Sequence, residues 1–354
     1  MTTTPLSDSR LSLSVLDLVP VRRGQTTSDA LQASLALAQR ADELGFTRYW
    51  VAEHHNMPSV ASTNPPVIIA LLAARTRHIR VGSGGVMLPN HSPLVVAEQF
   101  ALLEAAAPGR VDLGIGRAPG SDPVVSAVLA RSGTTTDVDA FPNAVSDIAA
   151  LLHADGATVR LTSGSDYQLK ATPAASGIPE LWLLGSSDYS ATLAAAVGLP
   201  YVFAHHFAGT GAERALEIYR TQFVPTERVP APRTFVTANV VVAESAAEAD
   251  ALALPQLQQM ARLRSNERLG PLPTVEEAAD AGLTALQREI VDQMRGSWII
   301  GDPDTAASRV RELARRFDVD EVMVSPVGSA RASEDPASAL SRVRTLELLT
   351  AALA

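Results

Sequence analysis

A carboxylate and two imidazoles follow directly after a strand-like apolar run. Residues 46–52 are mostly aromatic, β-branched or small and predict a buried strand, which ends in Glu53, His54 and His55. Because imidazole has the side-chain pKa closest to neutrality, two histidines beside a glutamate suit proton transfer, metal ligation or contact with a cofactor. A structural alternative also fits, in which Glu53 pairs with an arginine such as Arg48 and the histidines are loop or core groups.

Polar and small residues also stand at the ends of most other predicted strands. Because parallel strands of a barrel end at one rim, we expect them to meet there and form a site. These residues are Asp17, Gly84, Gly85, Met87, Asn90, His91, Gly116, Arg117, Ser186, Ser187, His205, His206 and Ser325.

Two of these strand ends favour a flat ligand that carries an anionic group. Gly84 and Gly85 remove side chains from one strand end and would let a planar cofactor approach the backbone. Arg117 offers a planar guanidinium for phosphate, and residues 185–187, including Gly185 and Ser186, offer hydroxyls and amides before a predicted helix. The alternative is that the glycines ease strand curvature and that Arg117 pairs with Asp122 or Asp112.

The elements that position these residues alternate between strands and helices. Near-continuously apolar strands separated by helices predict a parallel sheet covered on both faces, and eight of them fit a (β/α)₈ TIM barrel. A doubly wound open sheet is the alternative. The predicted strands are residues 11–19, 46–52, 79–88, 111–116, 181–184, 200–206, 234–243 and 320–325.

The connections predict helices and two departures from the regular pattern. A short hairpin is expected at 157–170, and a helical insertion at 244–297 lies between strands seven and eight. We expect one domain over 1–354, with this insertion as a possible lid over the barrel mouth. The predicted helices are residues 28–44, with Ser28 or Asp29 as the cap, 64–77, 93–107, 137–152, 188–198, 303 onward with Asp302 as the cap, and 336–353.

Composition narrows the class of protein. A net charge of −9 over 354 residues argues against nucleic acid as the main partner, because there is no basic field to attract phosphates. The absence of cysteine excludes disulfides, thiolate metal sites and a cysteine nucleophile. No apolar run reaches the roughly 18 residues of a membrane span, and the first ten residues do not form a signal peptide, so we expect a cytoplasmic enzyme.

Three motifs together resemble the bacterial luciferase-like flavin monooxygenases, within them the single-type, non-luminous members. The resemblance extends over most of the chain. The motifs are Trp-Val-Ala-Glu-His-His at 50–55, Gly-Ser-Gly-Gly-Val-Met-Leu-Pro-Asn-His-Ser-Pro at 82–93, and Gly-Arg-Val-Asp-Leu-Gly-Ile-Gly-Arg at 109–117.

The resemblance implies a cofactor, a reaction and roles for single residues. Reduced FMN would come from a separate NAD(P)H-dependent flavin reductase, and with O₂ it would oxygenate a small organic substrate of aldehyde, ketone or hydrocarbon type. Arg117, Ser186 and Tyr189 match the phosphate contacts, His54 matches the reactive histidine, and a cis peptide bond is expected at Gly84–Gly85. Members of this type commonly form homodimers.

One departure from the family pattern limits which residue roles can be assigned by resemblance. Three alternatives to the monooxygenase function also stay open. Gly116 stands where luciferases have a cysteine, so nothing about thiol sensitivity carries over. The alternatives are hydride transfer with the deazaflavin F420, a non-catalytic flavin-binding protein, and metal-dependent hydrolysis with Glu53, His54, His55 and His205. The last lacks a His-x-His pair on the first strand, so we expect no metal.

Overall fold

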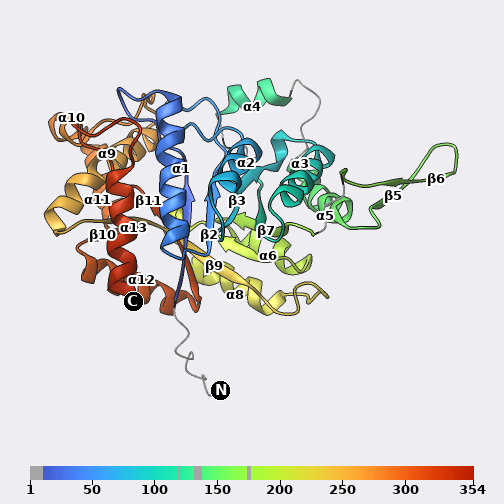
Figure 1. The fold of residues 1–354 in the computed structure, drawn as a ribbon. Helices are drawn as coiled ribbons and strands as arrows, with labels where there is room; N and C mark the ends of the chain where they lie inside the picture. The colour runs from blue at the N-terminus through green and yellow to red at the C-terminus, as the bar shows by residue number, and fades with distance from the viewer. Residues whose placement is uncertain (1–10, 119, 121, 131–137, 174–176) are drawn as a thin grey trace, which may run out of the picture.

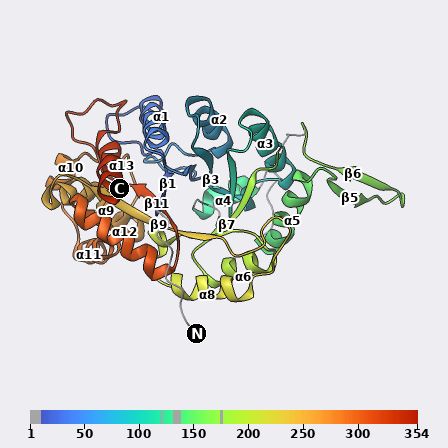
Figure 2. The same ribbon diagram turned by 60° about the horizontal axis from the view of Figure 1, so that its bottom comes forward.

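Eight parallel strands close into a barrel with helices around it, as the computed structural model shows (Figures 1 and 2). The structure describes residues 11–118, 120, 122–130, 138–173 and 177–354. Neighbouring strands follow the order β9, β11, β1, β2, β3, β4, β7, β8, and the pairing of β8 with β9 closes the ring. The barrel strands are β1 (Ser12–Asp17), β2 (Arg48–Val51), β3 (Arg80–Met87), β4 (Val111–Gly116), β7 (Glu180–Gly185), β8 (Tyr201–Phe203), β9 (Thr234–Val242) and β11 (Glu321–Pro326).

Three further strands lie outside the closed ring. β10 (Ile299–Gly301) pairs in parallel with β9 alone. β5 (Ala157–Arg160) and β6 (Asp166–Leu169) form an antiparallel hairpin that projects away from the barrel (Figure 1). The hairpin predicted at 157–170 is therefore confirmed.

Helices surround the strands in the order expected for a (β/α)₈ fold. None of those in the described ranges combines the length and apolar content of a transmembrane span. They are α1 (Thr27–Glu43), α2 (Pro65–Arg75), α3 (Pro93–Ala106), α4 (Pro123–Ala130), α5 (Phe141–Leu152), α6 (Asp188–Ala196), α7 (His205–Ala208), α8 (Ala212–Gln222), α9 (Ala246–Arg264), α10 (Val275–Asp280), α11 (Ala285–Ser297), α12 (Pro303–Phe317) and α13 (Leu340–Leu353), with short 3₁₀ turns η1 (Leu88–Asn90) and η2 (Val138–Ala140).

Local chemistry explains where several helices begin. Asp302 accepts from the Thr305 amide and Pro303 opens α12, as predicted. The cap of α1 is Thr26 rather than Ser28 or Asp29, because Thr26 and Asp29 form a reciprocal capping box. The last helix begins at Leu340, later than the predicted residue 336.

The sixth barrel strand is shorter than predicted, and this changes where two histidines lie. The chain leaves extended geometry at Ala204, with φ −76° and ψ 64°, and His205 and His206 form the first turn of α7 instead of ending a strand. Helices α4 and α8 were also not predicted. Residue 137, the predicted start of the fourth helix, lies outside the described residues.

Inside the barrel a compact apolar cluster fills the space between the strands, and we call it the floor. Trp50, Trp182 and Phe235 pack with ring centroids 5.0–5.8 Å apart. At the amino ends of the strands the buried Arg48 pairs with Asp112, Glu180 and Glu321. The barrel interior is therefore closed from that side, and a ligand must enter at the carboxyl ends. The floor consists of Leu16, Trp50, Trp182, Val202, Phe235 and Met323.

The segment between β9 and β10 forms α9, α10 and α11 and is fastened to the barrel. Its apolar side chains share a second core with Val241, Ala243 and Trp298. The Arg23 amide donates to Leu272 O at 2.8 Å, and the Leu272 amide donates to Val21 O at 2.9 Å. Its role as a lid stays a prediction.

Candidate active site

Glu53 lies fully buried just beyond β2 and organises three neighbours. Its Oε1 is 2.7 Å from His55 Nε2 and 2.8 Å from His91 Nε2, and its Oε2 accepts from the Met87 amide at 2.9 Å. Burial raises the pKa of this carboxyl, but hydrogen bonds from His55 and His91 outweigh burial and lower the pKa to about 2. Glu53 therefore carries a negative charge that fixes the strand end, and its contacts run to His55 and His91 rather than to His54.

His54 differs from its neighbour in having no partner for a buried ring atom. Its amide donates to Ser62 O at 2.9 Å, whereas its buried Nδ1 has no hydrogen-bond partner among the described residues. Burial lowers the pKa of His54. Trp50 belongs to the floor, so the alternation along β2, continued to His54, directs this ring toward the mouth of the barrel. A neutral imidazole with an unused nitrogen at this position could exchange a proton with a ligand.

His205 and His206 are separated by the turn of α7. The ring of His205 lies edge-on to Phe317, with centroids 5.2 Å apart, on the helix side of the barrel wall. His206 Nδ1 is 2.5 Å from Thr237 Oγ1, and Asn239 Nδ2 donates to His206 O at 3.0 Å. Only His206 of this pair therefore belongs with His54.

The Gly84–Gly85 peptide bond is cis, as the resemblance implied. The glycines themselves are explained by packing. A Cβ on Gly84 would lie 2.7 Å from Leu16 Cδ1, and one on Gly85 would lie 2.7 Å from Leu184 Cδ1. They leave room for the chain's own side chains, so they do not by themselves indicate a planar ligand.

Arg117 and Tyr189 come together from separate units of the barrel. The guanidinium carbon of Arg117 lies 4.0 Å from the centroid of the Tyr189 ring. No carboxylate in the described part of the chain lies within ion-pair distance of Arg117, and Asp112 is bound instead by Arg48 and Arg80. The pairing alternative for Arg117, with Asp122 or Asp112, is therefore wrong for both, and the Asp122 side chain accepts instead from the Val124 and Val125 amides.

The start of α6 lies beside this stack and has groups that could hold an anion. Ser187 is the N-cap residue, and its side chain makes no capping hydrogen bond. Ser186 precedes it and is exposed, and Asp188 is paired with Arg214 at 2.8 Å. A Cβ on Gly185 would clash with Ser190 Oγ at 2.0 Å, so this glycine is needed for the turn. A guanidinium, a hydroxyl and helix amides fit a phosphate group.

One other predicted rim residue, Asp17, has a structural role. Asp17 is buried and accepts hydrogen bonds from Tyr49 and Arg342. Thr237 and Asn239 were missed, although a polar residue at alternate positions of an apolar strand was a visible signal. Within the described residues, no three His, Asp or Glu side chains form a group that could hold a metal ion.

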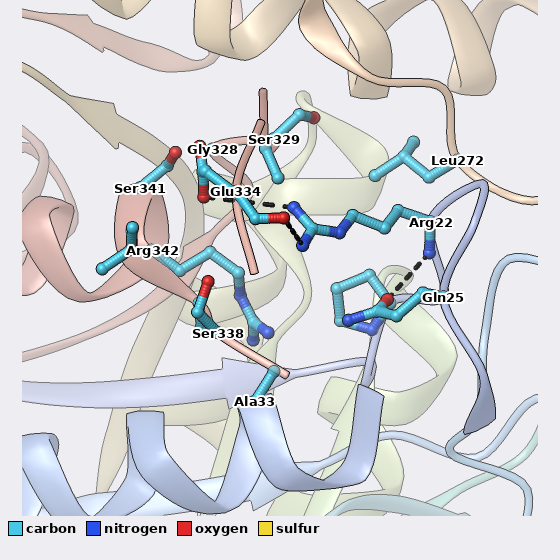
Figure 3. Close-up of a pocket in the computed structure, with 14 residues that line it drawn as sticks. Arg22, Gln25, Ala33, Leu272, Gly328, Ser329, Glu334, Ser338, Ser341 and Arg342 are labelled. Carbon is cyan, nitrogen blue, oxygen red and sulfur yellow. Dashed lines mark hydrogen bonds and ion pairs between the residues drawn. The ribbon is translucent and has the colours of Figure 1, made fainter. Parts of the chain in front are cut away.

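A separate small cavity of about 40 Å³ lies beside α1 and the segment before α13 (Figure 3). Arg22 donates to Glu334 O and Asp335 O there, and its Nη1 is 4.0 Å from Glu334 Oε2. None of the predicted site residues lines this cavity. The cavity is lined by two loops and by Leu272 of the 244–297 segment, and no histidine lines it.

Comparisons with known proteins agree with one another. A family model described as luciferase-like monooxygenase matches residues 12–320. A luciferase-like monooxygenase of Escherichia coli K12 is 40% identical over 320 residues, which cover 90% of this chain and 92% of that protein. An N-acetyl-S-alkylcysteine monooxygenase of Bacillus subtilis is 39% identical over 213 residues, which cover 60% of this chain and 62% of that protein. The crystal structure of apo-MsnO8 superposes with a TM-score of 0.82 at 34% identity and covers 98% of both chains.

Proposed function

This chain belongs to the luciferase-like monooxygenase family, and on that premise we propose that it is a flavin-dependent monooxygenase acting on a small organic substrate. It would use reduced FMN and O₂ to oxygenate an aldehyde, ketone or hydrocarbon. One observation supports this most: His54, with its unpartnered buried nitrogen, and the Arg117–Tyr189 stack both follow barrel strands at the carboxyl-end mouth.

The cofactor would be held by residues from three strand ends. Arg117, Ser186 and Tyr189, with the turn at Gly185, suit the phosphate, while Gly84, Gly85 and Met87 would lie beside the ring system. Reduced FMN, when bound, supplies the activation of O₂ and the oxygen atom that the substrate receives.

The protein contributes positioning, proton transfer and exclusion of water. His54 is the proposed acid/base, and burial lowers its pKa and favours the neutral imidazole. Glu53, named beside it from the sequence, acts through His55, His91 and Met87 and is better assigned as a positioning residue. The apolar floor, which includes Trp50 and Trp182, would keep water from the reacting groups on that side.

We further propose that the enzyme works in the cytoplasm with a separate NAD(P)H-dependent flavin reductase and forms a homodimer. Because reduced flavin would be delivered from outside, the protein with NADPH and FMN alone should give no turnover. Adding any flavin reductase should start it.

The test is oxygen incorporation from ¹⁸O₂ by the wild-type protein, a flavin reductase, NADPH and FMN, with a panel of aldehydes and ketones. One labelled oxygen atom in the product supports the proposal. Arg117→Ala should raise the FMN dissociation constant about 10- to 100-fold, the range for removing one charged hydrogen-bond partner, and Arg160→Ala, on the exposed hairpin, should not. Turnover with reduced F420 but not with reduced FMN would contradict the monooxygenase proposal and indicate hydride transfer. Tight FMN binding without any turnover would favour a flavin carrier.

A further inference from the structure

His206 is held rigidly at the mouth of the barrel by two residues of the neighbouring strand. Thr237 Oγ1 accepts a hydrogen bond from the His206 amide at 3.3 Å and lies 2.5 Å from His206 Nδ1. One hydroxyl therefore fixes both the backbone and the ring of His206. Asn239 holds the His206 carbonyl at 3.0 Å. Thr237 follows Phe235 of the floor by two residues, so it points to the interior of the barrel.

The free edge of the His206 ring is its Nε2 atom. Thr237 contacts Nδ1, and the hydrogen bonds of His206 with the described residues are made by its amide, its Nδ1 and its carbonyl oxygen, not by Nε2. A neutral imidazole offers one donor and one acceptor, so the nitrogen away from Thr237 is available to a ligand in either tautomer.

His54 and His206 lie on opposite sides of the barrel and are close enough to influence each other. β2 and β8 are four strands apart in a ring of eight, in either direction. Burial, with the nearby rings of His54 and His205, lowers the pKa of His206 to about 4. Burial therefore favours the neutral form of both imidazoles. The alternation past Trp50 and Val202 of the floor directs both toward the space above it.

Five interior positions just above the floor are uncharged. They follow the floor residues by two or four positions along their strands, and together with an apolar floor they suit an uncharged polar ligand. These positions are Ala52, Leu184, Ala204, Asn239 and Ser325.

We propose that His206 is a substrate-contacting residue that binds the carbonyl oxygen of a neutral substrate through Nε2, opposite His54, and that Thr237 is the positioning residue that orients it. This rests on the proposed monooxygenase function, because it assigns the substrate side of the same site. When the Thr237 hydroxyl donates to Nδ1, the proton of the neutral ring is on Nε2. Nε2–H can then donate a hydrogen bond to the carbonyl oxygen.

The first experiment needs no cofactor and uses 2-octanone as the probe. Histidine imidazoles are labelled with ¹⁵N in the flavin-free protein, and 2-octanone is titrated in. We expect the ¹⁵N signals of His206 and His54 to shift, while the signal of His205, on the other side of the wall, stays constant. An unchanged His206 signal overturns the proposal, whatever His54 does.

The second experiment compares three variants for 2-octanone affinity. His206→Phe should weaken binding about 10- to 100-fold and Thr237→Val about 10-fold, as expected for losing a hydrogen bond in a buried site. Thr237→Val should also move the His206 Nδ1 signal before any ligand is added. His205→Gln is the matched control, and equal affinity in His206→Phe and His205→Gln overturns the proposal.

Turnover separates this inference from the proposed function. With reduced FMN and O₂, Thr237→Val should raise KM more than it lowers kcat, because it misplaces a binding group. If the wild type oxygenates no substrate of the panel, the monooxygenase proposal fails. If it does, and Thr237→Val has the wild-type KM, the assignment of Thr237 and His206 fails alone.

Discussion

His54 and His55 are adjacent in the chain, yet the structure holds them in different ways. His55 is bound by Glu53, whereas His54 keeps a buried Nδ1 without a partner. A histidine that contributes only to stability is normally satisfied by hydrogen bonds, because an unpaired buried polar atom costs about 1–3 kcal/mol. Of these two adjacent rings, the unsatisfied one is therefore the one that we assign to chemistry. His205 also has a buried Nδ1 without a partner among the described residues, but its ring packs against Phe317 on the helix side of the barrel wall.

We expect His54→Ala to lower product formation at least about 100-fold, the usual effect of losing a positioned acid or base. The FMN dissociation constant should change little, because Arg117 and the start of α6 follow strands other than β2. Steady-state turnover and flavin fluorescence titration measure the two quantities. His205→Ala is the control, and an equal loss in both variants would remove His54 from the mechanism.

Glu53 gives a prediction for stability against pH. Its pKa is lowered from the ordinary 4.5 to about 2, so the charged carboxylate stabilises the folded state by on the order of 3 kcal/mol above pH 4.5. A lowered folded-state pKa means that this contribution is lost as pH falls from about 4.5 through about 2. The stability difference between wild type and Glu53→Gln should therefore be constant near pH 7 and shrink in that range.

Urea unfolding at a series of pH values measures this difference. Glu289→Gln, at an exposed position on α11, is the matched control and should show no such trend. A difference between wild type and Glu53→Gln that stays the same down to pH 2 would contradict the role of the Glu53 charge.

At the scale of elements, most of the fold could be predicted from apolar strands that alternate with helices along the chain. The run at 46–52 and the glycine-rich strand at 79–88 have the composition of buried parallel strands, and both lie in the barrel wall. The partners of Glu53 could not be predicted, because His91 is 38 residues away and reaches Glu53 only through the turn after β3. The end of β8 was missed because a backbone turn at Ala204 leaves no signal in an apolar run.

The 244–297 segment sets a condition on its role as a lid. Opening must break the amide hydrogen bonds between residues 21–23 and Leu272, and with them the bond from the Val275 amide to Ala330 O. We expect the amides of Arg23 and Leu272 to exchange with deuterium at least on the order of 100-fold more slowly than that of Gly164 in the exposed hairpin turn. Equally fast exchange at all three sites would show that the segment opens freely.

At the scale of the whole molecule, exposed apolar side chains gather on α2 and α3, which lie side by side (Figures 1 and 2). Val67 and Leu71 on α2 and Val95 and Leu102 on α3 are 42–59% exposed. Apolar side chains grouped on neighbouring helices are typical of a protein interface. This surface supports the proposed homodimer.

We expect the wild-type protein to elute with twice the 37.2 kDa mass of one chain, and Leu71→Glu or Leu102→Glu to give the monomer. A glutamate there would have to be buried without a partner, which costs more than one apolar contact contributes. Size-exclusion chromatography with light scattering measures the mass. Leu286→Glu, equally exposed on α11, should stay dimeric. A monomeric wild type would show that the protein does not dimerise. If all three variants stay dimeric, the subunits make contact elsewhere, and the exposed leucines and valines of α2 and α3 need another explanation.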